Sequence, residues 1–249
     1  MPRAARIVIP GLPHVVYQRG QGRRDVFRSD ADRSTYLEML QQQAQRFGAS
    51  ILGYCLMSDH VHLAVLPRTK QSLAQVIGRT HWLYSQFAAR RAKKGSDPVC
   101  AQHPSGRSGK RGLTPFSLWQ NRFFSCALDE SHLADVLLYI ERGPIRTRLS
   151  RYPWAYRWSS APAHSNGSDP SGLLDMAAWR KLSTPSQWRT LLVRPEDEAS
   201  AARIRLSLST GRPLATEATL TRLERRLGRR LRALPVGRPR KKPASKSRR

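Results

Sequence analysis

Acidic residues are scarce in this sequence of 249 residues. Aspartate and glutamate total 17 against 44 lysine and arginine residues, which leaves a net charge of +27. A compact chain with such an excess repels itself, so the imbalance indicates a polyanionic partner. Nucleic acid fits better than a membrane surface, because no strongly amphipathic basic helix with aromatic anchors stands out.

Long apolar runs and paired cysteines are also missing. No segment approaches the roughly 18 consecutive apolar residues that a membrane span requires. The apolar run at residues 7–9 is broken by Pro10 and Pro13 and is too short for the core of a signal peptide. The cysteines are odd in number and widely spaced, which argues against a disulfide framework; they are Cys55, Cys100 and Cys126. We therefore expect a cytoplasmic, nucleoid-associated protein without membrane contact.

The pattern of apolar residues predicts an α+β fold. Strands are expected at residues 13–19, 50–57, 60–66 and 122–128, and helices at about 30–47, 72–91 and 129–140. A Ser72-Leu-Ala-Gln75 capping box is expected to open the second helix. The order strand, helix, strand, strand, helix, strand is that of the ferredoxin-like split βαβ sandwich, an antiparallel sheet with helices on one face. The third helix is an addition to that arrangement.

Composition also predicts how the chain is divided. Residues 1–160 are expected to form the domain, interrupted by a flexible basic insertion at about 93–115 that is rich in glycine and serine. Residues 161–234 are expected to form a helical extension, with short helices near 201–208 and 217–231. Residues 235–249 are expected to be a disordered basic tail.

His60-Val61-His62 is the first candidate for chemistry. Side chains alternate along a strand, so both imidazoles project from one face while Val61 points into the core. Two adjacent imidazoles make half of a metal site. On spacing alone, a pair of surface histidines is the commoner explanation.

Tyr139 is the second candidate. At 100° per residue, the apolar stripe of its helix gathers around Leu133, Val136, Leu137 and Ile140, and Tyr139 falls about 120° from Leu133. It can therefore reach the sheet edge or lie exposed. For a tyrosine taken alone, a packing role is commoner than catalysis.

Four separated segments then carry a resemblance: PGLPHVVYQRG, YCLMSDHVHLAV, LWQNRFFSCALDESHL and YIERGPIRTRL. In this order they resemble the REP-associated tyrosine transposases, which belong to the HUH single-stranded-DNA endonucleases. The resemblance runs from about residue 7 to residue 160. The later GRPL and GRPRKK segments are similar to the C-terminal extension of that family. With this resemblance, metal binding and catalysis become the favoured interpretations of the histidine pair and the tyrosine.

The resemblance implies a specific chemistry. His60 and His62 would hold Mg²⁺ or Mn²⁺, which binds and orients the scissile phosphate. Tyr139 would attack the phosphate, giving a 5′-phosphotyrosine and a free 3′-hydroxyl. The substrate would be single-stranded or hairpin DNA, bound by a monomer or a homodimer.

One position departs from the family pattern. The family usually has Asn-Pro where this chain has Gly143-Pro144, and that asparagine would complete the metal site. Gly143 has no side chain to ligate with. Glu141 is expected to project away from Tyr139, and His132 lies about two helical turns from it, so no third ligand is evident.

The excess of basic residues predicts the DNA-binding surface. Residues 221–249 carry a net charge of +12 out of the total of +27, so the rest of the chain is basic as well. Any single arginine is more often a solvated surface charge. The expected contacts, some of them after the first strand, others beside the presumed site or in the tail, are Arg19, Arg23, Arg24, Arg122, Arg142, Arg146, Arg238, Arg240, Lys241 and Lys242.

Two other functions stay open on the sequence. One is a DNA-binding protein that keeps the transposase fold without cleaving, which Gly143 favours. The other is an RNA-binding protein on the same sheet, which the lack of an RNP1-like aromatic strand disfavours. Trp82, Tyr84 and Trp119 could stack on bases, although core packing is the more usual role for each.

Overall fold

The computed structural model describes residues 6–93 and 118–233. A four-stranded sheet forms its centre, with the order β2-β3-β1-β4 and every neighbouring pair antiparallel. Its strands are β1 (His14–Arg19), β2 (Ala49–Leu56), β3 (His60–Pro67) and β4 (Phe124–Ala127). This order confirms the predicted ferredoxin-like arrangement.

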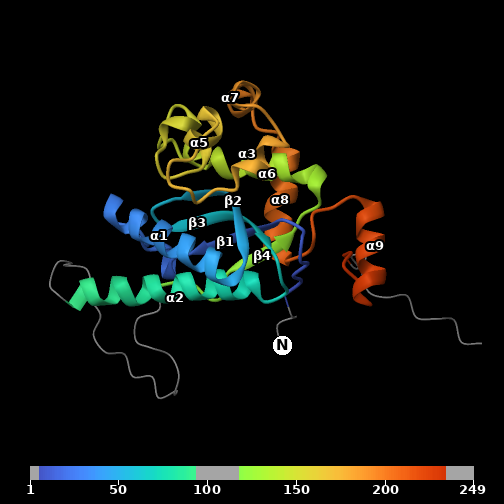
Figure 1. Cartoon of the computed structure of the whole chain (residues 1–249), viewed down its shortest axis with the longest axis horizontal. Helices are drawn as coiled ribbons and strands as arrows, with labels where there is room; N and C mark the ends of the chain where they lie inside the picture. The colour runs from blue at the N-terminus through green and yellow to red at the C-terminus, as the bar shows by residue number, and fades with distance from the viewer. Residues whose placement is uncertain (1–5, 94–117, 234–249) are drawn as a thin grey trace, which may run out of the picture.

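Helices α1 (Asp30–Phe47) and α2 (Ser72–Lys93) pack together on one face of the sheet (Figure 1). Helix α1 begins where the sequence predicts, because the Ser29 hydroxyl and the Asp32 carboxylate each accept a hydrogen bond from the other's backbone N–H. It ends at Gly48, which takes a left-handed φ of 65°.

The predicted capping box of α2 was wrong. The reciprocal pair is Thr69 and Ser72: the Thr69 hydroxyl accepts from the Ser72 N–H, and the Ser72 hydroxyl accepts from the Thr69 N–H, both at 3.1 Å. The capping residue is therefore Thr69, and Ser72 is the residue three positions later that completes the box. Gln75 instead donates its backbone N–H to the Gln71 carbonyl as an ordinary helical residue.

The opposite face of the sheet carries the helix with the candidate tyrosine. Asp129 caps a short 3₁₀ turn, η3 (Glu130–His132), which leads into α3 (Leu133–Glu141). After Arg142 the chain turns into α4 (Gly143–Arg146). Helix α3 packs against β2 and β3.

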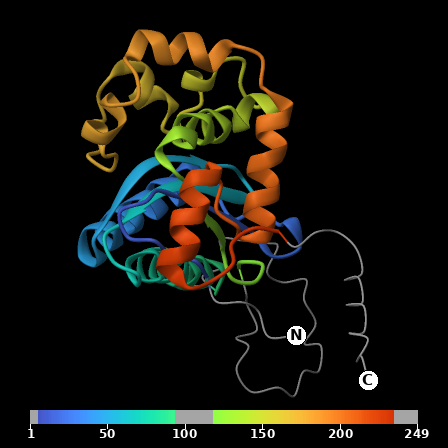
Figure 2. The same cartoon turned by 90° about the vertical axis from the view of Figure 1, so that its right-hand side faces the viewer.

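The remaining helices follow in the C-terminal half. Helix α8 runs beside the sheet from the outer helical layer toward β4, and α9 stands at one end of the molecule (Figures 1 and 2). The sequence predicted α8 and α9 but not α5 to α7. The bounds are η1 (Gln21–Arg23), η4 (Pro153–Ala155), α5 (Ala161–Asn166), α6 (Met176–Arg180), α7 (Pro185–Val193), α8 (Glu198–Thr210) and α9 (Glu217–Leu227).

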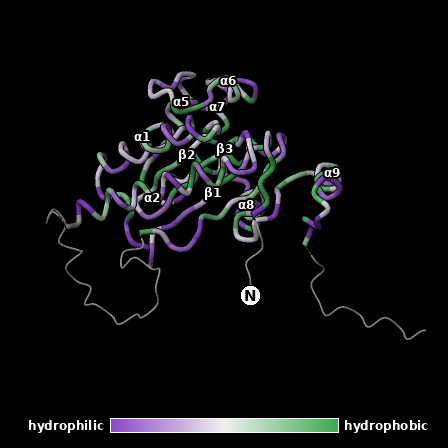
Figure 3. The backbone as a smooth tube through the Cα atoms, turned by 60° about the horizontal axis from the view of Figure 1, so that its bottom comes forward, coloured by the Kyte–Doolittle hydropathy of each residue, from purple (hydrophilic) through white to green (hydrophobic). Residues whose placement is uncertain are grey.

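Alternation along the strands gives the sheet a core on each face. Val16 and Leu63 pack in the cluster with α1 and α2, whereas their neighbours Val15 and Ala64 pack in the cluster with α3 and α8. Helix α9 carries both hydrophobic and hydrophilic residues (Figure 3), and its Leu223 is buried.

His60 and His62 are separated from Ala64 by an even number of positions along β3, so they lie on the same face of the sheet as Ala64, which is the face covered by α3.

A buried polar network fixes the C-terminal end of α3. Glu141 is completely buried, and its carboxylate accepts hydrogen bonds from Ser160 Oγ at 2.5 Å, His164 Nδ1 at 2.5 Å and Trp188 Nε1 at 2.8 Å. These partners come from the segments around α5 and α7. The network ties the extension to the helix that carries the tyrosine.

Close packing of α3 on β2 depends on Gly53. A Cβ atom there would lie 2.4 Å from Leu137 Cδ2 and 3.2 Å from Ser160 Oγ. Gly53 also marks the register shift in the pairing of β2 with β3. The absence of a side chain thus lets α3 approach the sheet at the level of the site.

Two predicted aromatic core residues are confirmed, since Tyr84 and Trp119 are buried. The prediction for Trp82 was wrong: it is 49% exposed, with the Arg79 guanidinium 4.2 Å above its ring. Among the described residues, no helix has both the length and the apolar character to cross a membrane.

Parts of the predicted domain organisation fall outside the described ranges. Nearly all of the basic insertion at about 93–115 and the whole of the tail at 235–249 do so. The domain boundary near residue 160 stays a prediction. Trp179, Trp188 and Ile204, all beyond that point, pack in the same core cluster as Val15 of β1.

Candidate active site

The two histidines lie side by side on the central strand β3. Pairing with β1 sets His60 opposite Arg19 and His62 opposite Tyr17. The imidazole ring centroids are 5.3 Å apart, and the Tyr17 ring lies 4.8 Å from His62 and 5.5 Å from His60. Because a strand repeats every two residues, both imidazoles project from the same face, as the sequence predicted, and this face is the one that carries α3.

The surroundings of both imidazoles favour the neutral form, which is the form that can bind a metal. Burial lowers the pKa of His60, although a hydrogen bond from Nδ1 to the Asp59 carboxylate at 2.5 Å opposes this shift. The pKa of His62 is lowered well below 6.5, first by burial and then by His60, Arg146 and Arg19. Nδ1 of His62 is buried and has no hydrogen-bond partner within the described ranges. A buried imidazole nitrogen without a partner fits a ligand role.

Tyr139 meets the histidine pair from α3. Its ring centroid lies 5.7 Å from that of His62 with the planes nearly perpendicular, and the residue is 8% exposed. The position away from the main apolar stripe therefore directs the phenol to the histidines and not to solvent. The Arg146 guanidinium from α4 lies 4.1 Å above the Tyr139 ring centroid. Arg146 is oriented by Glu196, whose carboxylate accepts from it at 2.6 Å.

Arg205 is a site residue that the sequence did not predict. It lies on α8, lines the same cavity as Tyr139 and interacts electrostatically with that tyrosine. Arg205 also forms an ion pair with Glu198. Glu198 first, and Tyr139 next, raise the pKa of Arg205. Arg205 follows Tyr139 by 66 positions and sits beyond the resembling segments, so no local pattern could indicate the contact.

These side chains share one cavity of about 370 Å³. Strands β1, β3 and β4 form its floor, and α3, α4 and α8 form its walls. Its lining residues are Tyr17, Arg19, His60, His62, Phe124, Tyr139, Gly143, Arg146, Thr147, Arg205, Leu208 and Ser209. The cavity thus gathers two imidazoles, two phenols and three arginines.

The two histidines and Gly143 meet in this cavity, but within residues 6–93 and 118–233 no third side chain joins the histidines as a metal ligand. Among the residues described, no group of three or more histidine, cysteine or acidic side chains could hold a metal ion. Glu141 is bound within its buried network, and His132 Nδ1 donates to Asp129 at 2.5 Å. A Cβ atom on Gly143 would meet only ordinary contacts, the nearest being Cys55 Sγ at 3.5 Å.

The predicted DNA-contacting residues separate into several groups. Arg19 and Arg146 line the cavity, and Arg122 lines a neighbouring one. Arg23 and Arg24 are exposed near η1. Arg142 instead donates to the Leu191 and Leu192 carbonyls at the end of α7, which is a structural contact. Outside the described ranges lie Arg238, Arg240, Lys241 and Lys242.

Comparison with known proteins places this geometry in a family. The family model described as IS200-like transposase matches residues 13–143, more than half of the chain. A search of curated proteins gave no significant match. One similar solved structure is that of a REP-associated tyrosine transposase bound to a REP hairpin; the identity is 13% and the TM-score 0.46, over 71% of this chain and 90% of that one. On the extent of the family match, the chain belongs to the IS200-like transposases.

Proposed function

We propose that this protein is a metal-dependent tyrosine transposase that cuts and rejoins single-stranded or hairpin DNA. The observation that carries the proposal is the meeting of Tyr139 with His60 and His62 in one cavity, beside Arg146 and Arg205. The net charge of +27 and the motif resemblance support a DNA substrate.

The attack would proceed from the phenol of Tyr139. Its oxygen bonds to the phosphorus of the scissile phosphodiester, and the bond from phosphorus to the 3′-oxygen breaks. The phenol loses its proton, the departing strand gains one as its 3′-hydroxyl forms, and the enzyme holds a 5′-phosphotyrosine. No redox partner is needed, and attack by another 3′-hydroxyl reverses the step and rejoins DNA.

Arginines in the cavity would assist this attack. An ordinary tyrosine has a pKa near 10 and is mostly protonated at neutral pH. Arg205 shares the cavity with Tyr139 and Arg146 lies over its ring, so both place positive charge near the oxygen on which negative charge develops. Arg19, across the cavity, is available to the phosphate.

His60 and His62 would hold the divalent ion, Mg²⁺ or Mn²⁺, through neutral imidazole nitrogens. When bound, such an ion neutralises and polarises the scissile phosphate. The chain itself fixes the two imidazoles through the β1–β3 pairing and through the bond from His60 to Asp59. This outer partner orients the ring in the manner common to metal-binding histidines.

A DNA-binding protein that no longer cleaves is the second candidate. The observation that favours it is Gly143, which supplies no ligand at the position where the family usually has asparagine. Such a protein would keep the cavity and the basic surface but form no covalent product.

A covalent-capture experiment separates these functions. The protein is incubated with Mn²⁺ and a pool of labelled single strands that carry a hairpin between random flanks, then resolved on a denaturing gel. The proposal expects a labelled protein band that requires metal and disappears with a chelator. DNA binding without such a band supports the second candidate, and preference for the matching RNA pool supports an RNA-binding function.

A further inference from the structure

A second cavity of about 610 Å³ adjoins the candidate active site. Four separate segments of the chain wall it: residues 6–7, the start of β4, the end of α8 and the loop after α9. The charged residues in its lining are all arginines, namely Arg6, Arg122, Arg212, Arg229, Arg230 and Arg232. We call this cavity the arginine groove.

Arg6 and Arg122 lie close enough in the groove for their charges to repel. Arg6 is half-buried, with its guanidinium 3.6 Å above the Phe123 ring and a 2.8 Å hydrogen bond to the Phe123 carbonyl. Burial, and next the charge of Arg122, lower the Arg6 pKa to about 10. Like charges in one partly buried groove repel each other, and a bound polyanion would relieve that repulsion.

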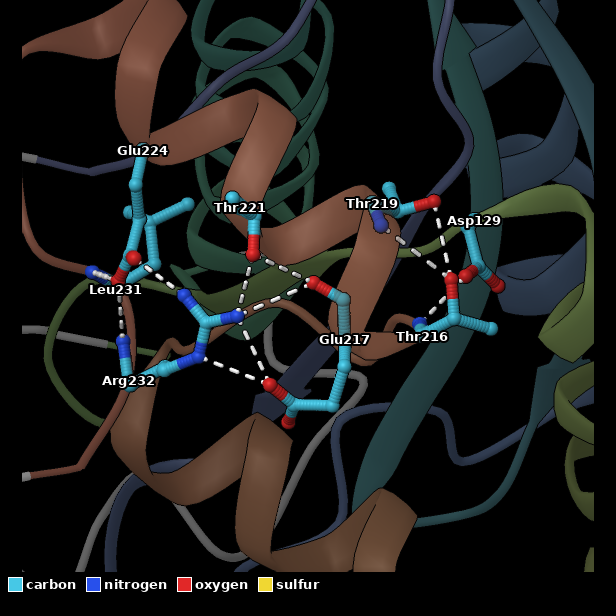
Figure 4. A network of polar contacts seen from close by, with 8 residues as sticks. All are labelled: Asp129, Thr216, Glu217, Thr219, Thr221, Glu224, Leu231 and Arg232. Carbon is cyan, nitrogen blue, oxygen red and sulfur yellow. Dashed lines mark hydrogen bonds and ion pairs between the residues drawn. The ribbon is translucent and has the colours of Figure 1, made fainter.

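Hydrogen bonds and ion pairs hold the outer wall of the groove, the loop after α9, in a fixed position. Arg232 donates to the carboxylates of Glu217 and Glu224 and to the Thr221 hydroxyl (Figure 4). Glu224 also accepts the Leu231 backbone N–H at 2.7 Å. The loop after α9 is thereby fastened to α9, which leaves Arg230 and Arg212 exposed on a fixed frame.

Helix α9 is in turn tied to the sheet layer. The Asp129 carboxylate, directly after β4, accepts the Thr216 N–H at 2.7 Å at the start of α9 (Figure 4). Leu223 of α9 and Leu231 pack with Ile9 and Ala127 in a small core of their own. The extension thus holds its arginines at a set position relative to β4.

The arginine groove is continuous with the active-site cavity. Phe124, Leu208 and Ser209 line both. Phe124 is 44% exposed and stands 6.3 Å from Tyr17 by ring centroids, so an aromatic face lies at the junction. A single strand whose scissile phosphate reaches Tyr139 would pass this ring, which offers a platform for stacking a base.

We infer that the arginine groove binds the phosphate backbone of the DNA strand beside the cleavage position, with Phe124 as a stacking platform at the junction. This inference rests on the proposed function, because that function gives the strand its position. The groove residues 208–212 and 229–232 lie beyond the family match at 13–143, so two of the four segments that wall the groove come from the C-terminal part of the chain.

The test measures binding without cleavage. All proteins carry Tyr139→Phe and are assayed without metal, with a fluorescent hairpin bearing single-stranded flanks, over a range of salt concentrations. In this background, Arg122→Ala with Arg212→Ala removes two exposed groove arginines. We expect weaker binding and a salt slope smaller by roughly 1.4, since each phosphate contact on a single strand contributes about 0.7. Phe124→Ala should weaken binding without changing the salt slope.

A matched control removes equal charge elsewhere. Arg46→Ala with Arg180→Ala deletes two exposed arginines that line neither cavity, and should leave the slope unchanged. Equal effects of the two double variants would show a general charge effect and overturn the inference, as would an unchanged slope for the groove variant. Tighter, groove-dependent binding of the matching RNA would overturn the DNA assignment. Because no variant here can form the adduct, failure of the proposed function appears only in the covalent-capture experiment.

Discussion

Gly143 lies in the active-site cavity at the position where the family usually supplies an amide oxygen. Its Cβ position has ordinary clearance and its φ is not in the left-handed region, so the backbone accepts a side chain. We expect Gly143→Asn to tighten metal binding and to raise the rate of adduct formation by up to about 10²-fold, because an additional ligand restricts the ion to one position.

The matched control for that change is Gly143→Ala. Alanine adds a Cβ atom and removes the helical penalty of glycine, but carries no oxygen. Metal titrations of adduct formation for the three proteins measure the effect. If asparagine and alanine behave alike, or if the natural chain already saturates at low metal, then no ligand is missing at this position.

Arg205 offers a second test at the scale of one side chain. We expect Arg205→Ala to slow adduct formation by about 10- to 10²-fold at saturating DNA, because a donor beside the reacting oxygen is lost while Arg146 remains. Arg205→Lys should restore part of the rate. Exposed Arg203, on the same helix but outside the cavity, gives the control Arg203→Ala. A loss of DNA affinity alone, with the saturated rate intact, would contradict this role.

At the scale of elements, Gly53 determines how closely α3 approaches β2. We expect Gly53→Ala to lower the free energy of unfolding by about 1–3 kcal/mol, because the new methyl group would overlap Leu137. It should also slow adduct formation, because α3 carries Tyr139. Urea denaturation and the capture assay measure the two effects.

Helix α2 provides the comparison. A Cβ atom on its Gly78 would meet nothing within 4 Å, so Gly78→Ala should raise the free energy of unfolding by about 0.5–1 kcal/mol. If both variants were equally stable, the close approach of α3 to Gly53 would be absent in solution.

The elements also show which local signals suffice. Helix α1 was predicted because a capping residue at Ser29 or Asp30, apolar residues at helical spacing and a terminal glycine all agree, and the structure adds a full capping box. Helices α5 and α6 have six and five residues and lack that periodicity, and burial of Trp179 and Trp188 holds this region in place. Tertiary contact, which no local pattern records, decides such short helices.

The candidate site divides in the same way. The histidine pair and Tyr139 were predicted. Alternation along a strand and rotation along a helix depend on residues close in sequence, and the order of the motifs can be read directly from the chain. Arg205 was missed, because only the packing of α8 beside the sheet brings it to the tyrosine. The cavity therefore depends on the whole chain, although its chemistry depends on short motifs.

At the scale of the whole molecule, buried neutral histidines link stability to pH. His14 is bound to the Ile9 N–H and the Leu12 carbonyl, and His81 to the Tyr36 hydroxyl. Burial lowers their pKa values from 6.5 to about 4 and about 3, respectively. Because these folded-state values are depressed, stability is complete above pH 6.5 and is lost as the pH falls toward them, by up to about 1.4 kcal/mol per pH unit for each histidine.

Urea denaturation at pH 6.5 and at successively lower pH measures this loss. We expect His81→Gln, which can keep a partner for Tyr36, to show a shallower fall than the natural chain over the same window. Equal slopes for the two proteins would mean that His81 is not held neutral in the folded state.

The identity of the nucleophile tests the central claim most directly. Tyr17 lines the same cavity as Tyr139 and lies nearer to His62, so it is the natural competitor. The measurement is capture of labelled DNA with Mn²⁺, followed by mass spectrometry of the labelled peptide, for the natural chain, Tyr139→Phe and Tyr17→Phe. We expect the label to lie on Tyr139, Tyr139→Phe to form no adduct, and Tyr17→Phe still to form one. An adduct on Tyr139→Phe, or a label on Tyr17, would contradict it.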